Sequence, residues 1–364
     1  LRTLPGMESF DSRVECLKLI RPGFGLKDAP RLWNLALKRV LASIGLQQCN
    51  SDPQLYAQHE KGVLILVLSV HVDDIKLTGL LDRCKKCLQA LEAKFDQMKT
   101  SWNNFTHLGI EHVTLPDGSR SLSQDAYVKE LRPIPEAEVK ILKPEDAVSP
   151  ATGKLFMSLL GALAWVVQTR PDIAVYISAL QRRLQRPTAT DILNLNRVLK
   201  YVKVRPVKLV YKKVQGPWKL VAVSDSSYKG EDQDSLAVRS GVIALTSKEG
   251  VRQGENPMQL IEFVSRKQSR VCRSTFAAEL HSLLDLFGLA TVINAAMTEL
   301  LTGACTAAYL AQALDHGTNA LSLEMVIDHR GLLDATASEN NRSTDSSVLL
   351  HLMKLREDLQ KRIS

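Results

Sequence analysis

The sequence has few cysteines and no long uninterrupted apolar run. Its longest apolar runs, Val63 to Val70 and Leu155 to Val167, fall short of the ~20 residues that cross a bilayer. Six cysteines are scattered along the chain, and no apolar segment with a cleavage site opens it. We therefore expect no membrane partner, no disulfides, and a reducing compartment, either the cytoplasm or the nucleus.

Several catalytic signatures are also absent. The chain has no GxGxxG or GxxxxGKS/T phosphate-binding loop, no GxSxG and no HExxH. Cys84 and Cys87 form a CxxC without the second ligand pair that a structural zinc site needs, so we interpret them as two thiols on a helix face. An enzyme that acts on something other than nucleic acid therefore has little support.

The composition is that of a folded, basic protein. With 364 residues the chain is long enough for two or three domains, and 45% apolar with 24% charged residues is typical of globular proteins. Lysine and arginine number 47 against 39 acids, a net charge of +8, which fits a polyanionic partner. Because the first residue is Leu1, we expect a processed product or a piece of a longer chain.

Hydrophobic periodicity predicts a mixed α/β fold. Helices are expected over residues 31–44, 82–98, 190–202, 274–301 and 346–359, and residues 156–184 have a strong helical pattern in which Pro171 is placed to start or stop a helix. Strands are expected over residues 63–70, 75–78, 219–223, 241–246, 259–264 and 323–327. A proline-rich stretch at 130–150 predicts a linker, and the last third has the order β-β-β-α-β-α.

Acidic residues at strand ends could carry chemistry. Asp73 and Asp74 lie in a tight turn after an apolar strand, Asp225 and Asp328 each follow a short strand, and Glu279 lies one turn into a helix that Ser274 caps. Each acid alone has an ordinary explanation as a turn, cap or solvated residue. Together, the last three favour a centre for two Mg²⁺ ions, or Mn²⁺, of the kind that cleaves phosphodiesters.

Two basic segments could follow a nucleic-acid backbone. Residues 197–213 hold seven basic side chains and no acid, and Arg266, Lys267, Arg270 and Arg273 lead into the Glu279 helix. An ordinary solvated surface is an equally good explanation when these segments are considered without the acids.

Read together, these residues resemble the reverse transcriptase and ribonuclease H portion of a copia-type retrotransposon polyprotein. The resemblance covers nearly the whole chain and rests on motifs that occur in the family's order and spacing. They are Gly25-Leu26-Lys27-Asp28-Ala29-Pro30-Arg31 with Trp33, Ser51-Asp52-Pro53, Val72-Asp73-Asp74, Leu108-Gly109-Ile110, Thr169-Arg170-Pro171-Asp172-Ile173, Ser224-Asp225-Ser226, Ser265-Arg266-Lys267-Gln268, Ala278-Glu279 and Ile327-Asp328.

The resemblance implies three regions. Residues 1–130 would be part of a reverse-transcriptase palm and fingers, 131–215 a linker and helical connection, and 216–364 a ribonuclease H-like domain whose mixed five-stranded sheet is truncated. Asp73 and Asp74 would hold polymerase metals, with Lys27 and Arg31 near template or incoming nucleotide. The other three acids would hold nuclease metals, and RNA–DNA hybrid or duplex would be the partner.

The sequence also departs from the family pattern. It starts after the family's first polymerase aspartate and stops before its fourth nuclease acid, so we expect no primer extension by this chain alone. His71 replaces the tyrosine that usually precedes the paired aspartates, and Asp345 is interpreted as a helix N-cap. A catalytically inactive nucleic-acid-binding relic of the element is the alternative.

Overall fold

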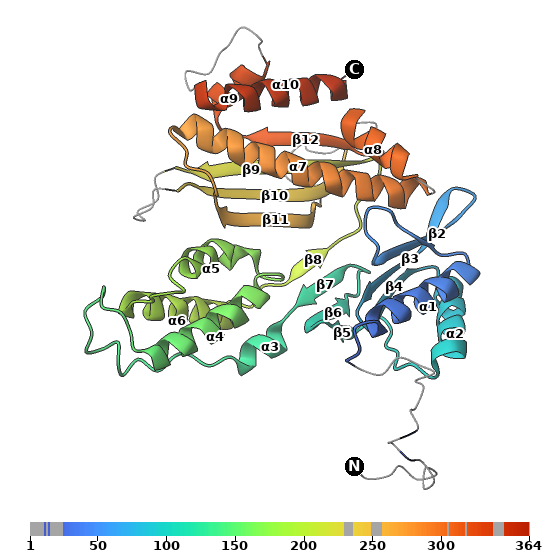
Figure 1. Cartoon of the computed structure of the whole chain (residues 1–364), viewed down its shortest axis with the longest axis horizontal. Coiled ribbons are helices and arrows are strands. Elements are labelled where there is room, and N and C mark those ends of the chain that lie inside the picture. Colours follow the sequence, from blue (N-terminus) through green and yellow to red (C-terminus); the bar gives the residue numbers. More distant parts are fainter. Residues whose placement is uncertain are drawn as a thin grey trace. The chain divides into compact units, whose positions relative to one another are not determined.

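The computed structural model describes residues 11, 14, 25–228, 236–248, 257–303, 306–316, 319–337 and 346–363. The chain forms two compact units, Leu1–Gln48 with Pro53–Met98 and Cys49–Asp52 with Lys99–Ser364. Both combine helices with antiparallel strands (Figure 1). The predicted mixed α/β class is therefore confirmed, whereas the division into three regions stays a prediction.

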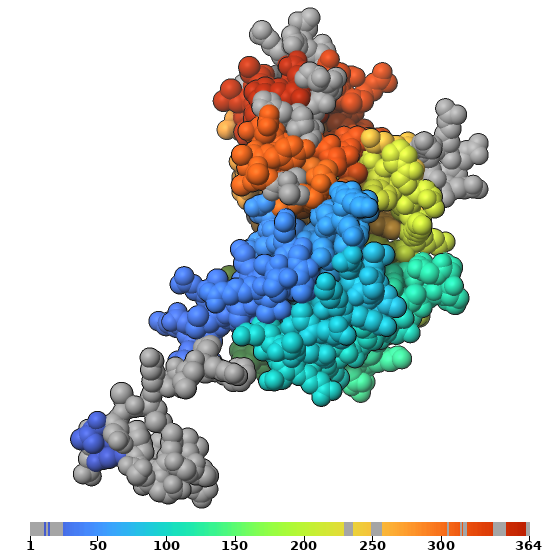
Figure 2. Space-filling model, turned by 90° about the vertical axis from the view of Figure 1, so that its right-hand side faces the viewer, coloured from blue at the N-terminus to red at the C-terminus, as the bar shows by residue number. Residues whose placement is uncertain are grey.

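The first unit is a four-stranded antiparallel sheet with two helices packed against it. Its strands are β1 (Gln47–Gln48), β2 (Leu55–Glu60), β3 (Val63–His71) and β4 (Asp74–Gly79), and its helices are α1 (Ala29–Ser43) and α2 (Leu81–Phe95). The apolar run of β3 is buried because it meets the apolar faces of both helices. Figure 2 draws the surface of this unit in blue and cyan.

The cysteines that the structure describes lie in buried positions. Cys84 and Cys87 lie inside α2 in the core of the first unit, and burial raises the pKa of Cys87 to about 12. Cys49 and Cys272 are also buried. Cys16 and Cys305 lie outside the described residues.

The second unit begins with a small antiparallel sheet and a group of helices. The sheet has the order β5 (Phe105–His107), β6 (Ile110–Thr114), β7 (Arg120–Ser123) and β8 (Leu209–Tyr211). The helices are α3 (Asp125–Glu130), α4 (Pro150–Val166), the 3₁₀ turn η1 (Pro171–Ile173), α5 (Ala174–Gln181) and α6 (Ala189–Val204). Their shared core includes Phe156, Leu160, Leu163, Ile173, Ile192 and Leu195.

The helical pattern over residues 156–184 forms α4, η1 and α5, and Pro171, expected to start or stop a helix, opens η1 between the two helices. The first helix begins at Pro150, where the Ser149 side chain accepts a hydrogen bond from the Thr152 amide and proline suits the first helical position. It ends before Pro171, since proline cannot donate the hydrogen bond that would continue it.

Arg170 lies between α4 and η1 and joins them to the end of α6. It is 3% exposed, and its Nε and Nη2 donate to the two Asp172 carboxylate oxygens at 2.9 and 2.7 Å. Nη1 donates to the carbonyl oxygens of Val202 and Arg205, and the guanidinium lies 5.4 Å from the centre of the Tyr201 ring. The motif of residues 169–173 therefore has a structural role in this helical group.

The last part of the second unit is a mixed sheet in the order β11-β10-β9-β12. Its strands are β9 (Trp218–Ser227), β10 (Val238–Ser247), β11 (Gln259–Lys267) and β12 (Ser322–Ile327), of which β12 runs parallel to β9 and the others are antiparallel. The helix α7 (Thr275–Thr302) crosses one face (Figure 1), and Gly241 permits the close approach because a Cβ there would lie 2.7 Å from Leu286.

Three shorter helices complete this part of the chain. They are α8 (Ala307–His316), α9 (Arg330–Ala337) and α10 (Leu349–Ile363), with the 3₁₀ turn η2 (Ser346–Val348) before the last. The sequence analysis expected α10 but neither α8 nor α9. Asp345, interpreted as an N-cap, lies outside the described residues.

By length and composition α7 could cross a membrane, although no single apolar run suggested it. In the structure 56% of its most apolar stretch is buried, and it forms the centre of the fold on the β9–β12 sheet. Near its end Glu299 is buried, and its carboxylate accepts hydrogen bonds from the backbone amides of Asn50 and Ser51 at 2.7 and 2.9 Å. Their side chains donate to the same carboxylate, so segment Cys49–Asp52 belongs to the second unit.

We predict that Arg170→Met lowers the free energy of unfolding by about 3 kcal/mol. The substitution leaves Asp172 and two helix-end carbonyls without their donor, which is the expensive way to break a buried ion pair. Urea unfolding followed by circular dichroism measures the loss. Arg186→Met, at an exposed position nearby, is the matched control, and equal midpoints for the two variants would contradict the structural role.

Candidate functional site

Three acids from separate elements come together at one end of the β9–β12 sheet. Asp225 lies in β9, Glu279 in α7, and Asp328 directly after β12. One carboxylate oxygen from each lies within 4.8 Å of the others, and this is the one such cluster among the described residues. Asp225 and Asp328 are exposed, whereas Glu279 is 4% exposed.

The sheet register explains why these acids meet. In the parallel pair of β9 and β12, Ile327 lies opposite Ser224, so the next residue on each strand, Asp328 and Asp225, reaches the same edge. Ser274 starts α7 by accepting a hydrogen bond from the Ala277 amide, which places Glu279 in the part of the helix that packs on β9. The order strand, helix, strand used in the sequence prediction therefore brings the three side chains together.

Two ordinary explanations for single acids do not hold. Asp225 does not end its strand, because β9 continues to Ser227. The first turn of α9 is capped by His329, whose Nδ1 accepts from the Leu332 amide at 3.0 Å, so Asp328 is not the cap. A turn position for Asp225 and a cap position for Asp328 therefore do not account for these two acids.

The electrostatics of Glu279 fit a bound cation. Burial, and then the charges of Asp225 and Asp328, raise its pKa to about 7, although a hydrogen bond from the Ser226 amide acts in the opposite direction. Its buried Oε2 has no hydrogen-bond partner among the described residues. A divalent cation would supply that partner and offset the repulsion, and carboxylate oxygens are the ligands that hard cations prefer. The three residues could thus hold a metal ion.

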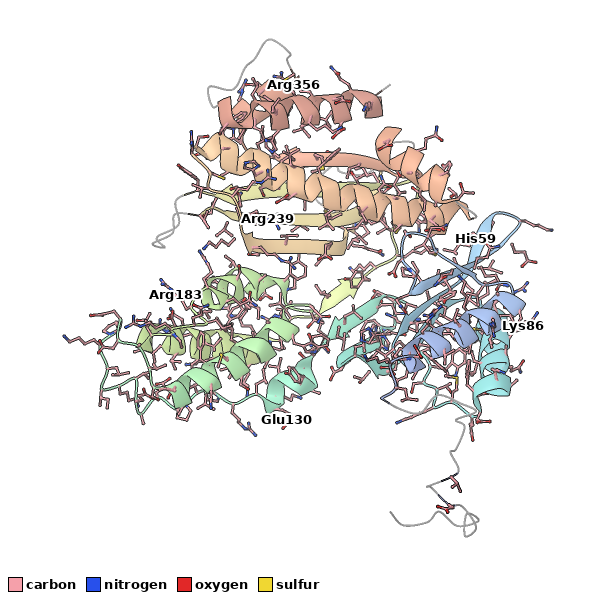
Figure 3. The ribbon with its side chains drawn as sticks, in the orientation of Figure 1. His59, Lys86, Glu130, Arg183, Arg239 and Arg356 are labelled. Carbon is pink, nitrogen blue, oxygen red and sulfur yellow. The ribbon has the colours of Figure 1, made fainter. Side chains whose placement is uncertain are left out.

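A groove with a volume of about 410 Å³ lies beside the acids, between β10, β11 and α7. Its lining includes Ser240, Arg266 and Ser282, and the Ser282 hydroxyl donates to the Asp225 backbone oxygen at 2.8 Å. Arg239 of β10, labelled in Figure 3, pairs with Asp285 of α7 on the same groove.

The basic residues predicted to bind nucleic acid are distributed over both units. Lys27 and Arg31 are exposed at the start of α1. Arg266, Arg270 and Arg273 are exposed on or after β11, whereas Lys267 is partly buried. Arg270 contacts the His351 ring nitrogen at 2.9 Å.

Much of the basic run over residues 197–213 has structural partners. The Lys203 ammonium donates to the Leu131 carbonyl oxygen at 2.5 Å, Arg205 lies over the Tyr201 ring, and Lys208 is 3.6 Å from the Asp125 carboxylate. The contacts reduce the number of charges in this run that are available to a nucleic acid.

Asp73 and Asp74 are exposed at the tip of the β3–β4 hairpin. In the antiparallel register of this hairpin, His71 lies opposite Asp74. Val72 in this turn has φ of +57°, a conformation that is strained for a β-branched residue. The Trp33 indole of α1 donates to the Val72 carbonyl oxygen at 2.9 Å and packs on Phe95. Trp33 therefore fixes the turn that carries the two acids.

Gln268, the last residue of the Ser265-Arg266-Lys267-Gln268 motif, was not predicted as a site residue. Its buried side chain makes hydrogen bonds to the elements that carry Asp225 and Glu279. In the sequence, the sign that Gln268 differs from its neighbours is an uncharged amide within a basic segment. Its hydrogen-bond partners are seen only in the folded chain.

Comparison with known proteins identifies the family of this chain. A model of the family "Reverse transcriptase (RNA-dependent DNA polymerase)" matches residues 1–138. The Retrovirus-related Pol polyproteins from transposons RE2 and RE1 of Arabidopsis thaliana are each 28% identical over 313 residues, 81% of this chain and 20% of the relative. The chain belongs to the copia-type retrotransposon Pol polyproteins.

Two further relatives each match a little under half of this chain. A putative transposon Ty5-1 protein of Saccharomyces cerevisiae is 28% identical over 197 residues, 49% of this chain and 62% of the relative. An uncharacterized mitochondrial protein of Arabidopsis thaliana is 30% identical over 177 residues, 45% of this chain and 72% of the relative. The chain itself spans about a fifth of the length of the RE2 and RE1 Pol polyproteins.

We predict that the metal-free protein loses stability as the pH rises from 5 to 8. The pKa of Glu279 is raised from 4.5 to about 7 in the fold, so the folded state keeps a proton that the unfolded chain releases. This stabilisation is complete below the ordinary pKa and is lost as the pH passes through about 7. Urea unfolding in EDTA should show a difference of roughly 2 kcal/mol.

Glu279→Gln should remove most of that pH dependence, because the amide does not titrate. Glu262→Gln, an exposed position on β11, is the matched control and should keep the wild-type slope. The same slope in Glu279→Gln and wild type would rule out the assigned protonation.

We further predict that Trp33→Phe loosens the turn at residues 72–73. The loss of one hydrogen bond of about 1 kcal/mol should speed amide exchange in the β3–β4 hairpin roughly fivefold. Hydrogen exchange read by mass spectrometry on peptides from this hairpin tests it. Trp102→Phe, at an exposed tryptophan in the second unit, is the control and should leave the exchange rate of the hairpin unchanged. An unchanged exchange rate in Trp33→Phe would show that the contact does not hold the turn.

Proposed function

We propose that residues 216–364 form a ribonuclease H-type nuclease that cuts RNA within RNA–DNA hybrids. The observation that carries this proposal is the convergence of Asp225, Glu279 and Asp328 on one edge of a mixed sheet, with oxygens within 4.8 Å of one another. When bound, a pair of Mg²⁺ or Mn²⁺ ions supplies activation of the attacking water and stabilisation of the leaving oxygen.

The remaining functions of the site follow from the side chains around the acids. The three carboxylates hold the ions, and cation binding displaces the proton that Glu279 keeps up to about pH 7. The groove beside Ser240 and Ser282 receives a nucleic-acid strand. Arg266, Lys267, Arg270 and Arg273 neutralise its phosphates, so binding weakens steeply with salt.

The first part of the chain contributes to an RNA-directed DNA polymerase in the intact polyprotein. Asp73 and Asp74 at the hairpin tip hold its metal ions, and Lys27 and Arg31 lie near template or incoming nucleotide. The family match over residues 1–138 and the exposure of all four side chains support this role. We assign residues 1–130 to this part and 131–215 to a helical connection.

We predict that the chain cleaves the RNA of a labelled RNA–DNA hybrid in the presence of Mg²⁺ or Mn²⁺, and that Asp225→Asn lowers the rate by roughly a hundredfold or more. Loss of one carboxylate from a group that acts as a unit removes most of its effect. Gel analysis of the labelled RNA measures the rate.

Asp334→Asn, an exposed aspartate on α9, is the matched control and should cleave as the wild type does. Equal cleavage by Asp225→Asn and wild type would refute the nuclease assignment. Salt-sensitive hybrid binding without any metal-dependent cleavage would instead favour an inactive nucleic-acid-binding relic.

A further inference from the structure

In the loop between β11 and α7, the buried amide side chain of Gln268 lies between β9, which carries Asp225, and α7, which carries Glu279. Gln268 is 4% exposed, and its Nε2 donates to the Ala278 carbonyl oxygen at 2.8 Å and to the Ser226 hydroxyl at 3.3 Å. Its backbone amide donates to the Ala237 carbonyl oxygen at 2.7 Å. Gln268 therefore links the loop to β9, to α7 and to the segment before β10.

The partners of this amide are neighbours of the acids in sequence. Ser226 follows Asp225, and Ala278 precedes Glu279. The Ser226 backbone amide also donates a hydrogen bond to the Glu279 carboxylate. A shift of Gln268 would consequently change the position of Glu279 relative to Asp225, which is the separation that a shared cation depends on.

The chemistry of the amide suits this position. The Ala278 carbonyl oxygen accepts a hydrogen bond from Gln268 Nε2 at 2.8 Å, and the Cys272 thiol donates one to Gln268 Oε1 at 2.9 Å. A primary amide supplies a donor and an acceptor at fixed geometry. Because the Cys272 thiol donates to Oε1, Nε2 is the atom that faces the α7 carbonyl. Neither a carboxylate nor an apolar side chain of similar size makes both hydrogen bonds.

The acids place like charges where α7 packs on β9. Glu279 is 4% exposed, and its carboxylate has an oxygen within 4.8 Å of oxygens from Asp225 and Asp328. Ser282, one turn along α7, makes a second link because its hydroxyl donates to the Asp225 carbonyl oxygen at 2.8 Å. Gln268 bonds to Ala278, which directly precedes Glu279, so polar contacts link α7 to β9 both before and after the glutamate along the helix.

We propose that Gln268 is a positioning residue for the acidic centre. Its side chain holds Glu279 and Asp225 at the separation that a divalent cation requires. The inference rests on the proposed metal centre and adds to it a residue that contacts neither substrate nor ion. Changes in residues that orient metal ligands typically lower metal affinity ten- to a hundredfold.

The test is a calorimetric titration of the whole chain with Mn²⁺ alone. Gln268→Met keeps the length and bulk of the side chain without its hydrogen bonds, and should raise the Mn²⁺ dissociation constant at least tenfold. Gln259→Met is the matched control, because Gln259 lies at the other end of β11 and also donates one side-chain hydrogen bond, to Lys212. It should bind Mn²⁺ as the wild type does.

Thermal unfolding in EDTA separates positioning from general stability. A positioning role predicts that Gln268→Met loses affinity even when its melting temperature is close to that of Gln259→Met. If Gln268→Met does not fold, Ser226→Ala provides a milder variant, since it removes only the hydroxyl partner and should weaken Mn²⁺ binding severalfold. Wild-type affinity in the variant that folds would overturn the role.

Asp225→Asn distinguishes failure of this inference from failure of the metal centre. If wild type binds Mn²⁺, Asp225→Asn does not, and Gln268→Met binds as tightly as wild type, only the positioning role is wrong. If the wild type binds no Mn²⁺, the metal centre is wrong and the positioning role is wrong with it.

Discussion

The mutual repulsion of three carboxylates is the constraint on which the C-terminal part of this fold depends. At about 4 Å, two like charges near a protein surface repel by roughly 4 kcal/mol, so the fold must hold Asp225, Glu279 and Asp328 together against that force. Parallel pairing of β9 with β12 fixes two of them, and the capped start of α7 fixes the third. Burial, and then the charges of Asp225 and Asp328, raise the pKa of Glu279, and a divalent cation is the natural counter-charge.

Several motif residues have structural roles that chemistry alone would not suggest. Trp33 holds the turn before Asp73, Ser51 helps satisfy the buried Glu299 carboxylate, and Arg170 ties the end of α6 to η1. Gln268 belongs to the same class, since each makes a hydrogen bond to a residue distant in sequence. In this chain, short motifs therefore include residues that link secondary-structure elements as well as the candidate catalytic acids.

The sequence predicted the candidate site better than it predicted the element boundaries. Asp225, Glu279 and Asp328 could be grouped because strand, helix and strand each leave a local periodic signal, and parallel strands end at a common edge. The helical pattern over residues 156–184 did not reveal that Ser149 starts the first helix earlier, at Pro150, or that this helix ends at Val166. No local pattern predicts α8 or α9, or the partners of Gln268, because these depend on contacts with distant parts of the chain.

The central claim is that the three acids form one divalent-cation site. Anomalous diffraction from crystals of this chain grown with Mn²⁺ tests it most directly, since the signal locates the ion independently of activity. The account predicts a manganese peak within coordination distance of carboxylate oxygens from Asp225, Glu279 and Asp328. No peak there at saturating Mn²⁺, or these side chains too far apart to share an ion, would contradict it.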